Sequence, residues 1–282
     1  MANYNKFSGR NISILNLFSM TSILIFINVI AFVLFTILTL TGVIPFDYIA
    51  LKPANIVQGK ALWTFITSMF MHAGFTHLFF NMISLFFIGT FVEKIIGRKR
   101  YTWFYLISGL VAGLFFVFLA YFFGNSVLGA KIFGSPDISG VGASGAIFGL
   151  LGLLAVLIPN KKVYLIAGPL IAIIIQAILS TLYPLSPFLG IVSSLITVYI
   201  FVSIFTMFSF NENTRKISLP LEMPFWLLPI IAIIPLVIIG LFVPLPIGNT
   251  AHLGGLLTGI FYGIYLKNKY KRKTQYLNRH FN

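Results

Sequence analysis

The residue best suited to act as a nucleophile in this chain is a serine that lies between glycines. Gly142-Ala143-Ser144-Gly145 opens an apolar run that continues to Leu157, so Ser144 is expected in the first turn of a helix. Free backbone N–H groups gather in that turn and the helix dipole is positive there, which favours a developing oxyanion. The alternative is that these small residues only let two membrane helices approach closely.

A second stretch offers two hydrogen-bond donors on one helix face. His77 and Asn81 are four residues apart, and that spacing places them on the same side of a helix. Taken singly, a buried His or Asn is usually no more than a satisfied polar residue. Two such donors on one face, near the outer end of one apolar run, are more typical of groups directed at a common point.

A third stretch supplies a base. His252 lies near the start of the last apolar run, where Gly255, Gly259 and Gly263 follow at intervals of four. Such a smooth stripe lets a helix pack closely against another, and the run after Ser144 has a similar glycine surface. His252 could then reach Ser144, and a neutral imidazole is the usual base for a serine nucleophile. The alternative is glycine-stripe packing with an incidental His.

The elements that must position these residues are expected to be membrane-spanning helices. Of the 282 residues, 59% are hydrophobic and only 9% are charged, whereas soluble domains carry about 25% charged residues. Several apolar runs approach or exceed the roughly 20 residues that cross a bilayer. We expect an all-α, polytopic helical bundle with eight spans, at residues 22–43, 77–92, 103–123, 143–158, 163–182, 187–208, 225–243 and 250–266.

Charge gives the expected orientation. With the N-terminal segment 1–21 and the basic tail 267–282 in the cytoplasm, only Lys52, Lys60 and Lys131 of the 19 Lys and Arg residues fall outside cytoplasmic segments. The positive-inside rule explains the formal net charge of +14 better than nucleic-acid binding does. We therefore expect a lipid bilayer and no nucleic acid among the partners. The broken segment 44–76 is expected to lie in the outer interface, anchored by Trp63.

The acidic residues limit the possible chemistry. There are five of them, Asp47, Glu93, Asp137, Glu212 and Glu222, and none is central in an expected span. This argues against an aspartyl protease and a carboxylate-based ion pathway. The sequence has no His-Glu-x-x-His motif and no Cys, so neither a metal site nor a cofactor is expected.

Together the three stretches resemble the rhomboid family of intramembrane serine proteases. The family's Gly-x-Ser-Gly, His-x-x-x-Asn and Ala-His-x-x-Gly-x-x-x-Gly motifs match residues 142–145, 77–81 and 251–259. Trp63 and Gly89-x-x-x-Glu93-x-x-x-Gly97 extend the resemblance. It implies that Ser144 is the nucleophile and His252 the general base and acid. It also implies an oxyanion hole made by His77, Asn81 and the backbone N–H of Ser144.

Three features depart from the family pattern. Thr64 follows Trp63, where the family often has Arg. Phe148, expected to stack on the base, stands where Tyr is common. His252 follows Ser144 by 108 residues, which leaves room for three spans where a six-helix core has one. Two additional spans are therefore expected, and of the three runs we favour 225–243 as the family's gating helix.

The resemblance implies an endopeptidase that cuts in or next to transmembrane segments of other membrane proteins. The expected substrate is a single-span protein with a small residue at the cleavage site, and the expected location is a prokaryotic cell membrane. The first alternative is an inactive rhomboid-like protein that binds membrane-protein clients. A transporter or channel is the second, but it would require intramembrane charges or inverted-repeat helices, which the sequence lacks.

Overall fold

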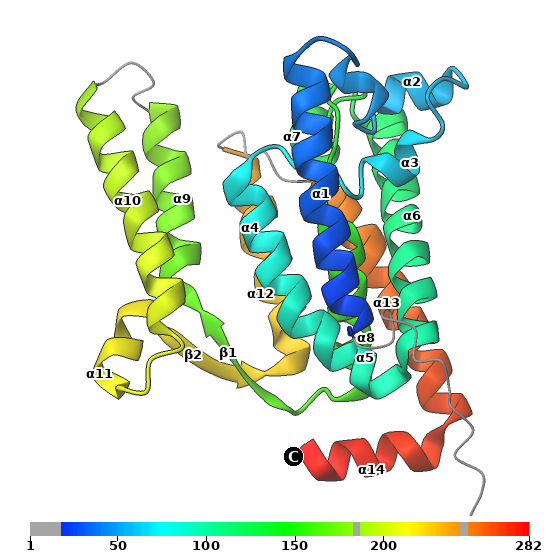
Figure 1. Cartoon of the computed structure of the whole chain (residues 1–282), viewed down its shortest axis with the longest axis vertical. Helices are drawn as coiled ribbons and strands as arrows, with labels where there is room; N and C mark the ends of the chain where they lie inside the picture. Colours follow the sequence, from blue (N-terminus) through cyan, green and yellow to red (C-terminus); the bar gives the residue numbers. More distant parts are fainter. Residues whose placement is uncertain (1–17, 183–186, 243–247, 282) are drawn as a thin grey trace, which may run out of the picture.

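The computed structural model of the chain describes residues 18–182, 187–242 and 248–281. Its longer helices run side by side, except for α14, which lies across the lower end of the molecule (Figure 1). The longer ones are α1 (Met20–Leu40), α4 (Phe75–Ser84), α5 (Thr90–Ile96), α6 (Arg98–Phe123), α8 (Ser144–Leu157), α9 (Ala167–Leu182), α10 (Pro187–Thr206), α12 (Leu228–Gly240), α13 (Asn249–Lys269) and α14 (Lys271–Phe281). The expected all-α, polytopic class is confirmed.

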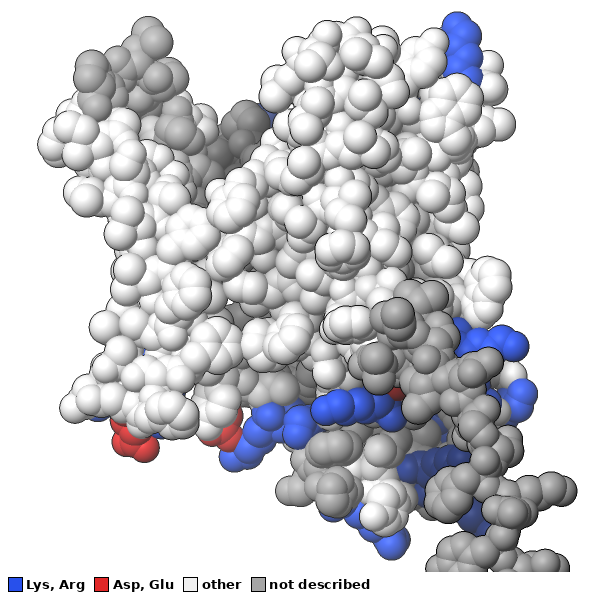
Figure 2. Space-filling view, viewed as in Figure 1, with Lys and Arg blue, Asp and Glu red and all other residues white. Residues whose placement is uncertain are grey.

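Helix length and surface identify an integral membrane protein. Four helical segments, Met20–Leu40, Phe75–Ile96, Arg98–Phe123 and Phe188–Thr206, are long and apolar enough to cross a bilayer, and Ser144–Leu157, Ala167–Leu179 and Phe225–Gly240 are shorter apolar helices. In Figure 2 a broad band without charged side chains covers the middle of the molecule, while Lys and Arg gather along its lower end. An uncharged band bounded by a basic edge fits a multi-pass protein whose sides face lipid.

The core is built around α8. Leu150, Leu153 and Leu154 of this helix are fully buried, and α6 and α13 pack against it and against each other. The close approach of α13 depends on glycine: a Cβ at Gly255 or Gly259 would meet the backbone of α8 at Gly145 or Gly149. The glycine stripe therefore holds the Ser144 and His252 helices in backbone contact.

The segment between α1 and α4 forms short helices at one end of the bundle: η2 (Phe46–Tyr48), α2 (Pro53–Val57) and α3 (Thr64–Thr67). It is tied to the loop that follows α7 (Val127–Phe133). Leu51 and Gly140 exchange two backbone hydrogen bonds of 3.0 and 2.8 Å, and Ser139 donates to Asp47 at 2.8 Å. Because this loop leads directly to Ser144, the first loop fixes the approach to α8.

Glu93 stabilises the start of α1. Helix α4 continues through a π-helical turn, η3 (Leu85–Gly89), into α5, which carries Glu93. Its carboxylate accepts hydrogen bonds from the backbone N–H groups of Met20 and Thr21 at 2.7 and 2.9 Å, and from the Thr21 hydroxyl at 2.8 Å. An anion at a helix N-terminus satisfies free N–H groups and the dipole together. These hydrogen bonds give Glu93, an acid near the end of a spanning helix, a structural role.

The region between α8 and α13 differs in detail from the sequence expectation. Residues Lys162–Ile166 form a strand, β1, antiparallel to β2 (Pro220–Pro224), so α9 begins at Ala167 rather than near Val163. Val163, Tyr164 and Ile166 are β-branched or aromatic and suit a strand, and a short apolar run cannot be divided between strand and helix by periodicity. Between β1 and α12 lie, in order, α9, α10, α11 (Glu212–Arg215), η4 (Lys216–Ser218), β2 and η5 (Phe225–Leu227).

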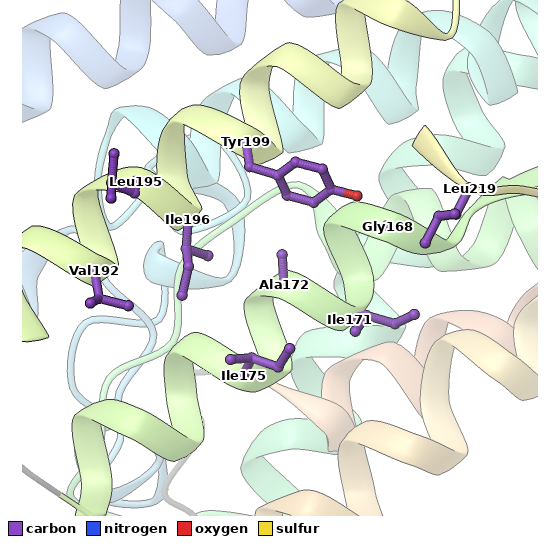
Figure 3. Close-up of a pocket in the computed structure, with 9 residues that line it drawn as sticks. All are labelled: Gly168, Ile171, Ala172, Ile175, Val192, Leu195, Ile196, Tyr199 and Leu219. Carbon is purple, nitrogen blue, oxygen red and sulfur yellow. The ribbon is translucent and has the colours of Figure 1, made fainter. Parts of the chain in front are cut away.

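Helices α9 and α10 form a hairpin that stands beside the bundle (Figure 1). It contacts the bundle through apolar side chains, among them Phe79 on α4 and Phe201 on α10, whose ring centroids are 5.0 Å apart. The two helices leave an apolar groove of about 430 Å³ between them, near Tyr199 (Figure 3). By contrast, α12 packs against both α8 and α13. The run favoured as the gating helix is thus the one adjacent to the Ser144 and His252 helices.

Candidate active site

Ser144 is the first residue of α8, as its place in the sequence predicts. Gly142, two residues earlier, has φ +128°, a backbone conformation that a residue with a side chain rarely adopts. Its N–H donates to the carbonyl of Ser68 at 2.8 Å. The chain therefore turns sharply into α8, and Ser144 sits where the helix has free N–H groups and the positive end of its dipole.

His252 lies in the first turn of α13 and faces Ser144. Its Nε2 is 2.8 Å from the Ser144 Oγ, which is a hydrogen bond. The ring is 8% exposed, and Phe148 stacks on it with centroids 4.2 Å apart and planes at 12°. Stacking fixes the ring plane, so that Nε2 stays directed at the hydroxyl. The other ring nitrogen, Nδ1, is buried without a hydrogen-bond partner in the described part of the chain.

His77 presents a donor edge to the same place. Its Nδ1 accepts a hydrogen bond from the Ala73 N–H at 3.3 Å, so we assign the ring proton to Nε2. A Cβ added at Gly142 would lie 3.0 Å from His77 Nε2 and 3.8 Å from Ser144 Oγ. The Nε2–H edge and the serine hydroxyl thus border the same small volume, which the missing side chain of Gly142 leaves open.

Asn81 is one turn further along α4 and is only 6% exposed. Its Nδ2 donates to the His77 carbonyl at 2.9 Å, and its Oδ1 is buried without a partner among the described residues. The structure records no direct hydrogen bond from Asn81 to Ser144 or His252 within the described ranges. Asn81 therefore lies one turn from His77 on α4, with one N–H that the His77 carbonyl does not engage.

His72 is a neighbour that the sequence interpretation did not single out. It is almost fully buried, its ring centroid is 5.2 Å from that of His77, and its Nε2 accepts the Ala143 N–H at 3.5 Å. It thus supports both His77 and the residue before Ser144. The sequence does place His72 in the same stretch as His77. A single His, however, gives no indication of which residue it contacts.

The length of α8 gives the depth of the site. This helix has 14 residues, which corresponds to about 21 Å at 1.5 Å per residue. The hydrocarbon core of a bilayer is about 30 Å thick. If the C-terminal end of α8 reaches the membrane boundary, Ser144 lies roughly 10 Å inside the opposite boundary. A hydroxyl, an imidazole and backbone N–H groups at that depth can activate and stabilise acyl transfer.

Comparison with known proteins gives the family. A family model described as the rhomboid domain matches residues 59–188 and, in a second and overlapping match, 162–269. Together the matches extend over more than half of the chain. The chain belongs to the rhomboid family. The overlap, 162–188, contains β1 and α9, which lie between α8 and α13 in the chain.

The rhomboid relatives include proteases and an inactive member. RHOMBOID-like protein 6, mitochondrial, of Arabidopsis thaliana is 40% identical over 116 residues, which are 41% of this chain and 33% of that protein. Rhomboid protease GluP of Bacillus subtilis is 37% identical over 111 residues, 39% of this chain and 18% of GluP. Inactive RHOMBOID-like protein 8 of Arabidopsis thaliana is 29% identical over 110 residues, 39% of this chain and 27% of that protein.

These matches cover a third or less of each relative's length. Membership therefore assigns the chain to a family of intramembrane proteases, but the activity, substrates and partners of the whole protein are matters for proposal. The relatives come from a plant and a bacterium, so the expected prokaryotic membrane stays a prediction.

Proposed function

We propose that this rhomboid protein is an intramembrane serine endopeptidase that uses Ser144 as nucleophile and His252 as general base and acid. The observation that carries the proposal is the 2.8 Å hydrogen bond between Ser144 Oγ and His252 Nε2. In the first step the imidazole takes the hydroxyl proton while Oγ attacks the scissile carbonyl. It then gives that proton to the leaving amine, and water releases the acyl group by the same route.

The donors around the serine support the second part of the proposal. The Nε2–H of His77 and the hydroxyl of Ser144 border the volume beside Gly142. We assign the N–H of Ser144, in the first turn of α8, as the second donor to that volume. An oxyanion in that volume would accept hydrogen bonds from both. Asn81 is assigned as a third donor through the N–H that the His77 carbonyl does not engage. Such preorganised donors usually supply the largest share of acyl-transfer catalysis.

The proposed substrates are transmembrane segments of other proteins, or residues next to them. A serine roughly 10 Å inside the membrane boundary is out of reach of folded soluble domains. An extended peptide bond must be brought to it, which favours single-span proteins with small residues and a weak helix near the cleavage site. We assign α12 as the gating helix, because it packs against both helices that carry the dyad.

The second candidate is an inactive protein that binds membrane-protein clients. One relative is named inactive, so membership alone does not decide between the two. The paired Ser144 and His252 favour the enzyme, since a pure binding protein has no need of a serine hydrogen-bonded to an imidazole.

Labelling by a fluorophosphonate probe tests the proposal. The purified full-length protein should be labelled covalently, and Ser144→Ala should abolish both labelling and cleavage of a reconstituted single-span substrate. His252→Ala should abolish cleavage as well, and the double variant should be hardly slower than either single one, since nucleophile and base act as a unit. Ser126→Ala, in an outer helix cap, is the matched control. Undiminished cleavage by Ser144→Ala would exclude the proposed nucleophile.

A further inference from the structure

A second site lies at the end of the bundle remote from Ser144. Between α6 and α13 an open groove of about 420 Å³ is lined by Lys99, Arg100, Trp103, Phe104, Ile107, Thr258 and Tyr262. Its walls are apolar and face outward: Trp103 is 60% exposed and Ile107 50% exposed. Trp at the end of a spanning helix is typical of the headgroup level of a bilayer. The groove thus combines an apolar surface that suits an acyl chain with two cations, Lys99 and Arg100, at one end.

Aromatic rings connect this groove to further positive charge. Tyr262 stacks on Phe104, with centroids 4.8 Å apart, and on Tyr265, at 6.1 Å. Lys269 donates to the Tyr265 hydroxyl at 2.7 Å, so a third cation joins this aromatic cluster. The groove therefore ends in a basic cluster rather than at a single surface lysine.

The position of Arg100 is fixed before any ligand binds. Its Nη2 donates to the Tyr270 hydroxyl at 3.0 Å, and its guanidinium lies 5.1 Å from the centre of that ring. A cation held this way loses little side-chain freedom on binding an anion. Arg also retains further N–H donors, which suit phosphate oxygens.

No carboxylate side chain of the protein neutralises Lys99 or Arg100. Each of the five Asp and Glu residues lies in the described part of the chain. Asp47 pairs with Lys52, Glu222 with Lys162 and Glu212 with Arg215. Glu93 caps α1, and Asp137 lies in the loop near α2 at the other end of the molecule.

The start of α6 adds to this imbalance. Its first turn carries no acid and holds three basic residues, Arg98, Lys99 and Arg100. Cations at the positive end of a helix dipole are unfavourable, and an anion there is favourable. This 26-residue helix therefore has the charge pattern of an anion site directly beside the apolar groove.

We propose that the groove between α6 and α13 binds one anionic glycerophospholipid of the leaflet that contacts the basic end of the protein. The phosphate lies on Lys99, Arg100 and the free N–H groups of the first turn of α6, and one acyl chain runs along Trp103 and Ile107. Basic pockets between spanning helices on the cytoplasmic side commonly hold such headgroups. A soluble phosphate would contact only Lys99 and Arg100, whereas a lipid would also cover the apolar walls, so the walls favour the lipid. The site is independent of the proposed peptidase activity.

Native mass spectrometry of the full-length protein tests this. With dioleoyl phosphatidylglycerol as the probe, the first bound lipid should have a Kd about 30-fold higher in Lys99→Gln/Arg100→Gln, since each basic side chain at an anionic lipid surface contributes about fivefold. The matched control, Lys271→Gln/Lys273→Gln, removes two exposed cations of α14 and should change the Kd little. Dioleoyl phosphatidylcholine should bind no more tightly to the wild type than to the groove variant.

A second variant distinguishes lipid binding in the groove from non-specific electrostatic attraction to the basic residues. Ile107→Trp fills the apolar wall without changing charge and should also weaken phosphatidylglycerol binding. Retention of full affinity in that variant, or equal loss in the α14 control, would mean diffuse surface attraction and would overturn the proposal. Equal binding of glycerol phosphate alone would identify a soluble-anion site and would overturn it too.

Discussion

The hydrogen-bond state of a single ring decides what His77 can contribute. Because Ala73 donates to Nδ1, the Nε2–H is the free donor, and it borders the volume next to Ser144. A His in the opposite tautomer would present a lone pair to a developing oxyanion and would oppose the reaction. The Ala73 N–H therefore matters as much as the residue itself, because it sets the tautomer.

His77→Ala and Asn81→Ala are expected to lower kcat, by roughly 10²–10³-fold for a fully engaged donor. The loss at Asn81 should be smaller, because the Ser144 N–H and His77 remain as donors to the oxyanion. His77→Gln keeps an N–H donor and should recover part of the rate, whereas KM should change little in all three. Single-turnover cleavage of a reconstituted substrate measures this. Wild-type rates in both alanine variants would show that these residues are structural.

At the scale of single residues the sequence supplied candidate groups but not the contacts between them. Ser144, His252 and Phe148 are brought together as expected, because motif spacing and glycine stripes already require two close helices. The support of His77 by Ala73 and the contact of His72 with Ala143 depend on how the loop before α4 folds, and no periodic pattern encodes that. Asn81 lies on the helix face expected from its spacing. Its hydrogen bond to the His77 carbonyl depends on its side-chain rotamer, which spacing does not predict.

At the level of whole helices, the close contact of α8 with α13 depends on glycines, which have no side chain. A Cβ at Gly259 would meet Gly149 and Leu153 of α8, whereas at Gly190 on α10 it would meet nothing within 4 Å. Separation of α8 and α13 would lengthen the Ser144–His252 distance directly, since one dyad residue lies on each helix. The glycine stripe thus couples helix packing to the chemistry.

Gly259→Leu should therefore abolish fluorophosphonate labelling and lower the thermal stability in detergent, because overpacking forces the two backbones apart. Gly190→Leu makes the same chemical change on an open helix face and should leave labelling and stability close to wild type. Labelling rate and melting temperature of both purified variants provide the comparison. Normal labelling of Gly259→Leu would mean that the close approach is not needed for the dyad.

The contact between the first loop and the loop before α8 can be tested through its pH dependence, because it includes the hydrogen bond from Ser139 to Asp47. The hydrogen bond from Ser139 lowers the pKa of Asp47 from its ordinary value, and Lys52 lowers it further. A carboxyl with a depressed pKa in the folded state contributes stability above its unfolded pKa and loses that contribution as pH falls through the folded pKa. Asp47→Asn should therefore be less stable than wild type at neutral pH, and the difference should disappear in strong acid.

Thermal unfolding at a series of pH values measures that convergence. Asp137→Asn, in the same loop region, is the control and should follow the wild-type profile. A constant difference between Asp47→Asn and wild type across the acid range would contradict the role of the ionised carboxylate.

Elements were predictable where apolar runs are long and isolated, as for α1 and α6. The stretch 162–166 was not, because a short apolar run suits a helix and a strand equally. It became β1 through pairing with Pro220–Pro224, a partner more than 50 residues away. The π-helical turn η3 also has no local sequence signal. Part of the expected run 225–243 and the turn between α9 and α10 lie outside the described residues.

Over the whole molecule, charge and shape are organised along the helix direction. Lys and Arg gather at the end that carries α14 and the proposed lipid groove (Figure 2), and Ser144 starts α8 toward the opposite end. The first-loop helices lie with the Ser144 end. If the basic end is cytoplasmic, as the positive-inside rule requires, the proposed peptidase opens toward the outer half of the membrane.

The α9–α10 hairpin makes this orientation testable. We predict eight spans, with both arms of the hairpin crossing, because α10 has 20 residues and the apolar run 163–182, which ends with the 16-residue α9, is equally long. Charged segments lie only at the β1–β2 end of the hairpin. If one of the two crossed alone, Lys161 and Lys216 would lie on opposite sides, and α13 would start from the side opposite to α8. His252 could then not meet Ser144, contrary to the 2.8 Å contact.

Single-cysteine mapping decides between two crossings and none, and the chain has no native Cys. A cysteine at Ser186, which lies between α9 and α10 in the sequence, should react with an impermeant maleimide on intact cells. A cysteine at Asn249 should do so too, while cysteines at Asn160 and Asn213 should react only after lysis. Protection of Ser186 in intact cells, with Asn249 still reactive, would show that the hairpin enters the membrane from the basic side without crossing. The core of the bundle would then carry the peptidase with six spans alone.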